Sequence, residues 1–244
     1  SKHEAKISAW LADRAKTSGF EVERDDANNV IIRVPATKGY ENAPIIALQG
    51  HMDMVCEKTP TSTHNFDTDP IEVIIEGDWM HANQTTLGAD DGLGVALALA
   101  MAEDPNVEHP RLEIIITSDE ETGMTGAIAL KPESVQARIL LNLDSEDEGI
   151  FTVGCAGGRE TTSTLDLSRA PLVAGSRKVD IHVTGLLGGH SGCEIHLGRA
   201  SPLQLINPNL ARPLYTSDAA DDLPRVYLDG RRTNKKKTHT SHRK

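Results

Sequence analysis

Apolar residues along the chain fall into short blocks separated by polar and glycine-containing turns. The blocks at 30–34, 44–49, 112–118 and 138–143 are rich in isoleucine, leucine and valine, a composition typical of strands. The last three contain so few polar positions that we expect buried strands. Residues 67–80 alternate between apolar and polar side chains, which predicts a more exposed strand pair.

Helices are predicted between these strands. Residues 1–18 form an amphipathic pattern that stops at Gly19, and the predicted apolar face consists of Ile7, Trp10, Leu11 and Ala15. Residues 92–101 are almost wholly apolar, so we expect a buried helix there, and another helix begins at 125–130. Because buried strands alternate with helices, the predicted fold is an α/β domain with a mostly parallel sheet flanked by helices.

A second unit is expected to begin near residue 176. Residues 179–184 alternate as a half-solvated strand does, and a helix could follow at 198–206. We therefore assign 1–175 to a first domain and 176–212 to the start of a second, α+β domain.

The last part of the chain has a different composition. Residues 214–244 carry eight lysines and arginines against four aspartates, in a chain whose formal net charge is -11. This stretch looks like the translation of a sequencing adapter, so we interpret 213–244 as adapter-like read-through. A genuine tail without a fold and a basic tail for nucleic acid are the alternatives.

Composition narrows the classes of partner. The acidic net charge and the 3% aromatic content disfavour a nucleic-acid surface. No apolar run is long enough for a membrane span, so we expect no membrane partner. Three widely spaced cysteines do not make a disulfide scaffold and suit the cytoplasm, the predicted location.

Acidic and imidazole side chains follow the buried strands or precede the apolar helix. They are His51, Asp53, Asp90, Glu120, Glu121 and Asp144. A single acidic residue at a strand end is usually a solvated loop residue. Here the residues form four clusters, at 51–53, 90, 120–121 and 144, and four clusters at one sheet edge would repel one another unless a cation lay between them. One histidine with several carboxylates suits Zn²⁺, Mn²⁺ or Co²⁺.

The motifs around these residues resemble one known family. They are LQGHMDMV (48–55), TTLGADDGLGVA (85–96), TSDEETGMTGA (117–127), LLNLDSEDEG (140–149), VGCAGG (153–158) and GLLGGHSGCEIHLGRA (185–200). Together they resemble the aminoacyl-histidine dipeptidase branch, also called peptidase D or cytosol non-specific dipeptidase. This branch belongs to the co-catalytic zinc peptidases related to aminoacylase and carboxypeptidase G.

The resemblance implies two divalent metal ions, zinc first, with cobalt or manganese as alternatives. His51 and Asp144 would bind the first ion, Glu121 the second, and Asp90 would bridge both. The peptide bond after Asp90 would be cis, as in the family.

The resemblance also implies three catalytic roles. Glu120 would be the general base, since adjacent residues of an extended segment point opposite ways and Glu121 is needed on the metal. Asp53 would orient the His51 imidazole. His190 would stabilise the oxyanion, as a lid-domain histidine does in relatives, often from the partner subunit.

The activity implied is hydrolysis of small peptides, Xaa-His dipeptides or dipeptides more broadly, by a water molecule that two metals activate. A homodimer formed through the lid domain is implied as well. An N-acyl amino acid deacylase of the same superfamily and a non-catalytic metal- or phosphate-binding fragment are the alternatives.

Length sets this chain apart from that family. Relatives are about twice as long, and nothing from Ser201 onward resembles their C-terminal half, which supplies a last histidine ligand. We therefore expect an incomplete copy that binds metal weakly and hydrolyses little.

Overall fold

The chain divides into two units, Ser1–Ala156 and Gly157–Lys244, each of which is considered by itself. The computed structural model describes residues 1–145, 149–155, 157, 162, 164, 166, 171, 173–176, 180–188 and 194–211, with backbone alone at 195 and 207–211.

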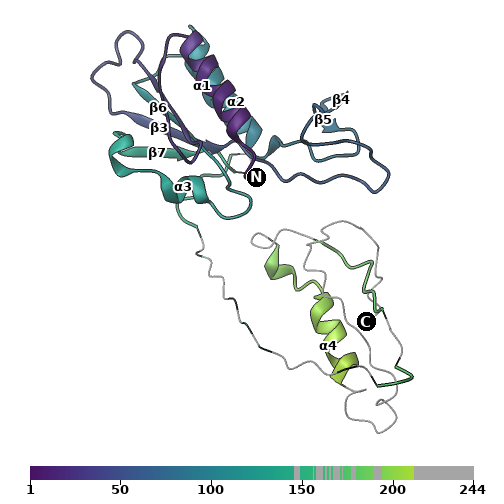
Figure 1. Ribbon diagram of the computed structural model, residues 1–244. Coiled ribbons are helices and arrows are strands. Elements are labelled where there is room, and N and C mark those ends of the chain that lie inside the picture. Colours follow the sequence, from purple (N-terminus) through teal and green to yellow (C-terminus); the bar gives the residue numbers. More distant parts are fainter. Residues whose placement is uncertain are drawn as a thin grey trace. The chain divides into compact units, whose positions relative to one another are not determined.

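The first unit is built on a five-stranded sheet with the order β1-β2-β6-β3-β7 (Figure 1). Its strands are β1 (Glu21–Arg24), β2 (Val30–Val34), β3 (Ile46–His51), β6 (Leu112–Thr117) and β7 (Ile139–Asn142). β3 pairs in parallel with β6 on one side and with β7 on the other, whereas β2 is antiparallel to both β1 and β6. The sheet is therefore mixed, and its parallel part lies where the sequence predicted metal-type ligands.

Two helices, α1 (Ala5–Thr17) and α2 (Ala89–Glu103), lie side by side on one face of the sheet (Figure 1). The main core lies between these helices and the sheet, and it contains Leu11, Ile32, Leu48 and Ile114. The opposite face carries a smaller core of Ile31, Ala47 and Ile115, packed against Leu130, Val135 and Ala137. The short helices α3 (Thr125–Ala129) and η1 (Pro132–Ser134) belong to the segment on this second face. The predicted α/β class is confirmed.

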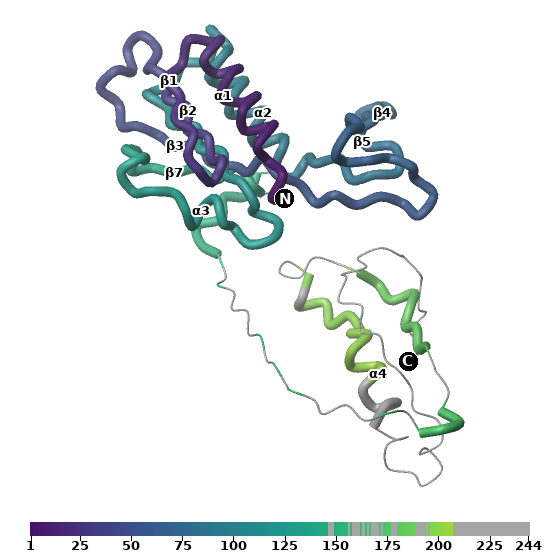
Figure 2. Tube along the Cα trace, in the orientation of Figure 1, coloured from purple at the N-terminus to yellow at the C-terminus, as the bar shows by residue number. Residues whose placement is uncertain are grey.

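The segment between β3 and α2 contains a β-hairpin. Its strands, β4 (Val73–Glu76) and β5 (Trp79–Ala82), pair antiparallel and form a sheet of their own (Figure 2). Ile75, Trp79 and Met80 are exposed, so the predicted exposed strand pair is confirmed.

The predicted apolar face of α1 is confirmed in part, because Leu11 and Ala15 are buried. Trp10 is exposed, with the Arg14 guanidinium 5.7 Å from its ring centre, and Ile7 is exposed as well. Ser8 is buried in their place, and its hydroxyl accepts a 2.7 Å hydrogen bond from the Arg24 side chain. Small residues on the inner face let the helix approach the sheet closely.

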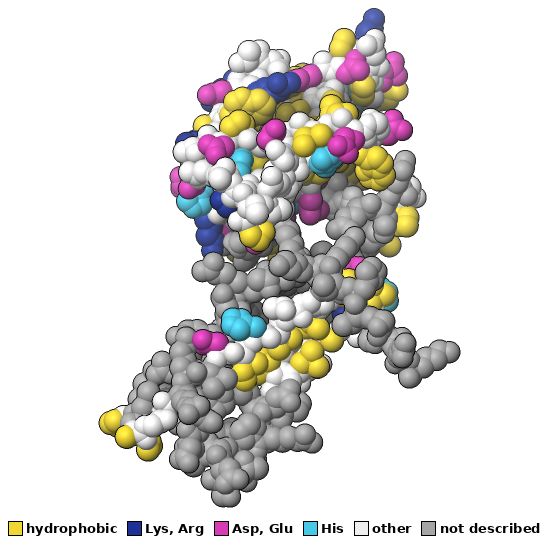
Figure 3. Space-filling model, turned by 90° about the vertical axis from the view of Figure 1, so that its right-hand side faces the viewer, with side chains coloured by type: hydrophobic (Ala, Val, Ile, Leu, Met, Phe, Trp, Pro, Cys, Tyr) yellow, Lys and Arg dark blue, Asp and Glu magenta, His cyan; other side chains and the backbone are white. Residues whose placement is uncertain are grey.

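Two further predictions of burial were wrong. α2 buries only one face, so Leu97 is 53% exposed while Leu99 is 7% exposed. β7 is a strand, but Ile139, Leu140 and Leu141 are exposed, since the described sheet pairs β7 on one side only. Hydrophobic side chains consequently lie among charged ones on the surface of this unit (Figure 3).

In the second unit, the described residues include η2 (Ile195–Leu197) and α4 (Pro202–Ala211). The helix predicted at 198–206 therefore begins four residues later. Residues 180–184, the described part of the predicted strand, are not in a strand, and residue 179 lies outside the described residues. The predicted domain limits stay predictions, and all of the proposed read-through, 213–244, lies outside the described residues. Among the described helices, none has the length and apolar character needed to cross a membrane.

Candidate metal centre

The carboxyl ends of the three parallel strands bring the predicted ligands together. His51 is the last residue of β3, Glu120 and Glu121 lie in the turn after β6, and Asp144 follows β7. Asp90 reaches the same place from the start of α2, and the Asp90–Asp91 peptide bond is cis, as expected. Ligand atoms of His51, Asp90 and Asp144 all lie within 4.8 Å of one another, and so do those of His51, Glu120 and Glu121.

The His51 imidazole is buried, and each of its nitrogens has a different environment. Nδ1 lies 3.0 Å from the Asp53 backbone oxygen and 3.4 Å from its carboxylate. Nε2 faces the carboxylates of Asp90 at 3.2 Å and Asp144 at 3.8 Å. A proton on Nδ1 would satisfy Asp53 and leave the Nε2 lone pair directed at the two acidic residues, the arrangement that metal-binding histidines use.

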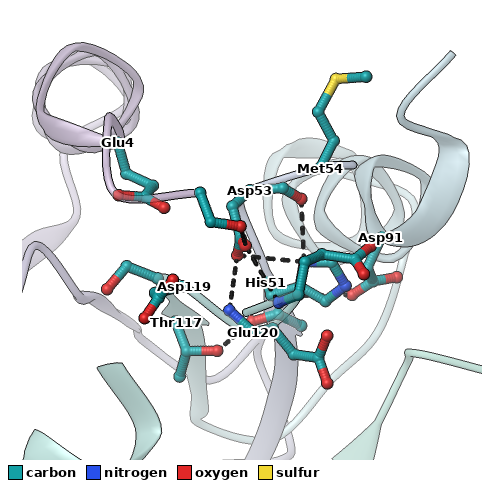
Figure 4. Close-up of polar contacts among 12 residues, drawn as sticks. Glu4, His51, Asp53, Met54, Asp91, Thr117, Asp119 and Glu120 are labelled. Carbon is teal, nitrogen blue, oxygen red and sulfur yellow. Dashed lines mark hydrogen bonds and ion pairs between the residues drawn. The ribbon is translucent and has the colours of Figure 1, made fainter. Parts of the chain in front are cut away.

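The carboxylate of Asp53 has a second function in the site (Figure 4). It accepts the backbone N–H groups of Glu120 at 3.0 Å and of Glu121 at 3.2 Å. Burial would raise the pKa of Asp53, but the hydrogen bonds from His51, Ser1 and these two N–H groups lower it strongly. Asp53 is therefore an anion that connects the end of β3 to the turn after β6.

The backbone at Glu120 and Glu121 is a turn and not the extended segment that the sequence analysis assumed. The Asp119 carboxylate accepts the hydroxyls of Thr122 and Thr125 and so braces this turn. Both glutamates place a carboxylate oxygen near His51. The argument from opposite side-chain directions does not apply, and the division of roles between Glu120 and Glu121 stays a proposal.

Asp91 is a residue that the sequence analysis left without a role. It is 4% exposed, and its carboxylate accepts the backbone N–H groups of His51 and Gly94, each at 3.2 Å. An aspartate that accepts the N–H three residues ahead is the usual start of a helix, so its position before an apolar helix could have revealed it. Burial raises the pKa of Asp91 despite these hydrogen bonds.

The other acidic groups repel one another. Burial and the neighbouring charge of Asp90 raise the pKa of Asp144 to about 6. Burial and the charges of Asp90 and Glu120 likewise raise the pKa of Glu121. Burial alone would lower the pKa of His51, but hydrogen bonds with Asp53 and Asp90 and the charge of Asp144 raise it to about 10.

The donor set fits a divalent cation. One imidazole nitrogen and several carboxylate oxygens converge, and their mutual repulsion is the electrostatic condition that a cation relieves. The Asp90 side chain is 60% exposed, so the cluster is open to solvent on that side. The remaining predicted site residue, His190, lies outside the described residues.

An α/β sheet that gathers one histidine and several carboxylates at the ends of parallel strands has the donor set of a metal-binding protein. Residues 47–214 match peptidase family M20/M25/M40, and the chain belongs to this family.

Individual relatives agree with this assignment. The chain is 47% identical over 206 residues to the cytosol non-specific dipeptidase of Escherichia coli K12, an alignment covering 84% of this chain and 42% of that protein. The crystal structure of aminoacylhistidine dipeptidase from Vibrio alginolyticus matches with a TM-score of 0.63 and 39% identity, covering 86% of this chain and 43% of that one. The crystal structure of aminopeptidase PepT from Bacillus cereus matches with a TM-score of 0.51 and 31% identity, covering 60% of this chain and 39% of that one. The chain thus spans less than half the length of these relatives.

Proposed function

We propose that the protein carrying this sequence is a metal-dependent dipeptidase. The observation that carries the proposal is the His51 imidazole, whose Nδ1 is held by Asp53 while its Nε2 faces Asp90 and Asp144. The similarity to a cytosol non-specific dipeptidase and an aminoacylhistidine dipeptidase supports dipeptides as substrates.

The proposed cofactors are two divalent ions, zinc first, with cobalt or manganese as alternatives. His51, Asp90 and Asp144 would hold one ion, and Glu121 would hold the other with Asp90 shared between them. Bound zinc ions would supply Lewis acidity and lower the pKa of a coordinated water molecule.

Glu120 is the proposed general base. Its carboxylate lies within reach of the same imidazole as that of Glu121, so it can take a proton from the attacking water and return it to the leaving amine. Asp53 keeps the imidazole oriented and, through two N–H groups, keeps Glu120 in place. His190 is proposed to stabilise the oxyanion of the transition state.

The proposal extends to the partners. Small peptides are the substrates, a homodimer forms through the predicted lid domain that begins at 176–212, and neither nucleic acid nor membrane takes part. The cytoplasm is the proposed location, supported by the name of the Escherichia coli relative. Access of a short peptide is consistent with the exposed Asp90 side of the cluster.

A paired substrate assay tests the function. The protein carrying this sequence is purified with Zn²⁺ and given Xaa-His dipeptides, other dipeptides and N-acetyl amino acids in parallel. We expect hydrolysis of dipeptides that is abolished by a chelator and restored by Zn²⁺. Hydrolysis of N-acetyl amino acids alone would reassign the protein as a deacylase, and Zn²⁺ binding without any hydrolysis would leave a non-catalytic metal-binding protein.

A further inference from the structure

Asp91 joins two elements of the candidate metal centre through a single buried carboxylate. Oδ2 accepts the backbone N–H of His51, at the end of β3, and Oδ1 accepts that of Gly94, in the first turn of α2. Both donors are buried, so each would lose a hydrogen bond without replacement if the carboxylate moved. In the close-up, Asp91 lies beside His51, on the α2 side (Figure 4).

Two glycines make room for this carboxylate. A Cβ added at Gly50 would overlap with Oδ2 of Asp91, and a Cβ added at Gly94 would overlap with Oδ1. At Gly92, in the same helix turn, an added Cβ would meet nothing within 4 Å. The close approach at Gly50 and Gly94 therefore belongs to the Asp91 carboxylate and is not a general property of this turn.

We propose that Asp91 is a positioning residue that sets the placement of His51 against the start of α2, and hence against Asp90. The proposal rests on the proposed function, because it takes His51 and Asp90 as metal ligands. Asp90 is the neighbour of Asp91 in the chain, and the backbone N–H of His51 donates to the Asp91 carboxylate, so one carboxylate fixes the backbone at two ligands. Ligand placement within a few tenths of an ångström is what metal affinity demands, so an effect on metal binding beyond that on folding is expected.

The chemistry requires an aspartate at this position. Both oxygens act as acceptors toward N–H donors, whereas an asparagine would place an NH₂ group against one of these donors. Asp91→Asn therefore keeps the shape of the side chain and removes one of the two connections.

The test compares variants of the full chain. Asp91→Asn and Gly94→Ala are measured against wild type, with Gly92→Ala as the matched control and His51→Ala as the reference for the metal site. Zn²⁺ affinity is measured by calorimetry, the His51 imidazole resonances by NMR without metal, and the fold by circular dichroism. We expect Asp91→Asn and Gly94→Ala to weaken Zn²⁺ binding about 10- to 100-fold and to shift the imidazole resonances, whereas Gly92→Ala changes neither.

The outcomes separate this inference from the proposed function. Zn²⁺ binding by Gly94→Ala and Asp91→Asn equal to that of Gly92→Ala, with unchanged imidazole resonances, overturns the positioning role. If His51→Ala binds Zn²⁺ as tightly as wild type, the proposed metal site is wrong. The imidazole resonances of the metal-free Asp91 and Gly94 variants still decide the role of Asp91 in that case.

A double variant covers the case in which Asp91→Asn does not fold. Gly94 is proposed to make room for the Asp91 carboxylate. In the double variant Asp91→Ala/Gly94→Ala, the second substitution should therefore neither weaken Zn²⁺ binding further nor shift the imidazole resonances further. If the shifts of the imidazole resonances in the two single variants simply add up in the double variant, the inference is contradicted.

Discussion

The carboxylate of Asp53 accepts the backbone N–H of Glu120 at 3.0 Å, so the residue that orients the candidate histidine also holds the candidate general base. The same carboxylate accepts the N–H of Glu121, and the Asp53 backbone oxygen lies 3.0 Å from His51 Nδ1. The loops after β3 and β6 are therefore positioned as one structure.

Replacing Asp53 by asparagine should loosen this connection. An NH₂ group would face backbone N–H donors, so we expect Zn²⁺ affinity to fall about 10- to 100-fold, as is typical when the partner of a metal-binding histidine is lost. Calorimetry with Zn²⁺ measures the change. Asp104→Asn is the matched control, because its carboxylate also accepts a backbone N–H, that of Asn106, at an exposed site. Equal affinities for the two variants would contradict the prediction.

Replacing Glu120 by glutamine should separate catalysis from metal binding. If Glu120 is the general base, dipeptide hydrolysis falls about 10²–10⁴-fold while bound zinc is retained. Initial rates and metal analysis of the same preparation report the two effects, with Glu133→Gln as an exposed control. A variant that has lost its zinc would make Glu120 a ligand.

Removing Asp90 should empty both proposed metal positions together, because one carboxylate is proposed to serve two ions. Metal content per chain of Asp90→Ala, measured after exhaustive dialysis, is the test. Asp78→Ala, in the exposed turn of the hairpin, is expected to keep the wild-type content. One tightly held ion in Asp90→Ala would argue against a bridge.

The two faces of α2 make opposite predictions for two leucines. Leu99→Ala should lower the free energy of unfolding by about 2–5 kcal/mol, because it leaves a cavity in the main core. Leu97→Ala, on the exposed face, should change it by about 0.5 kcal/mol or less. Urea unfolding of both variants measures these changes. Equal losses of unfolding free energy would mean that the helix is buried on all sides.

Stability against acid should depend on Glu23. A 2.6 Å hydrogen bond from the Ser134 hydroxyl and the contact with Arg33 lower the pKa of this carboxyl, so its contribution is present above pH 4.5 and is lost as the pH falls through its folded pKa. Ser134→Ala should cost about 0.5–1 kcal/mol at pH 7, a small value because Glu23 is 38% exposed. At pH 3 the difference should shrink. Urea unfolding at both values tests this, with Ser62→Ala as control, and a difference independent of pH would exclude Glu23 as its source.

The sequence predicted β2, β3, β6 and β7 because their apolar blocks are short and bounded by turns, as at 30–34 and 112–118, but it missed β1 and placed a strand at 180–184 where there is none. The strand ends then predicted which ligands meet, since parallel strands share a carboxyl edge. Burial was harder to predict. The pattern of α2 contains no polar face, so it cannot reveal which side meets the sheet, and the exposed strand β7 has the composition of a buried one.

Side-chain hydrogen bonds explain what the site prediction missed. Nothing local to Asp91 indicates that its carboxylate reaches the N–H of His51, a residue 40 positions away. The turn at Glu120 and Glu121 was also missed, because the Asp119 side chain that braces it bonds to threonines and not to the backbone of a recognisable turn. The Asp91 contact depends on the folded arrangement of two separate segments, whereas the Asp119 contacts join residues at most six positions apart.

The order of strands in the sheet has a consequence for synthesis on the ribosome. β2 and β3 follow each other in the chain, but β6 lies between them in the sheet. In a nascent chain, the edges of β2 and β3 that β6 will pair with therefore stay unpaired until residue 117 has emerged, and such edges invite pairing with other chains. Residues 52–111, which include the hairpin and α2, are translated while these edges of β2 and β3 are still unpaired. The length of chain made while these two edges can pair with other chains is set by this one insertion.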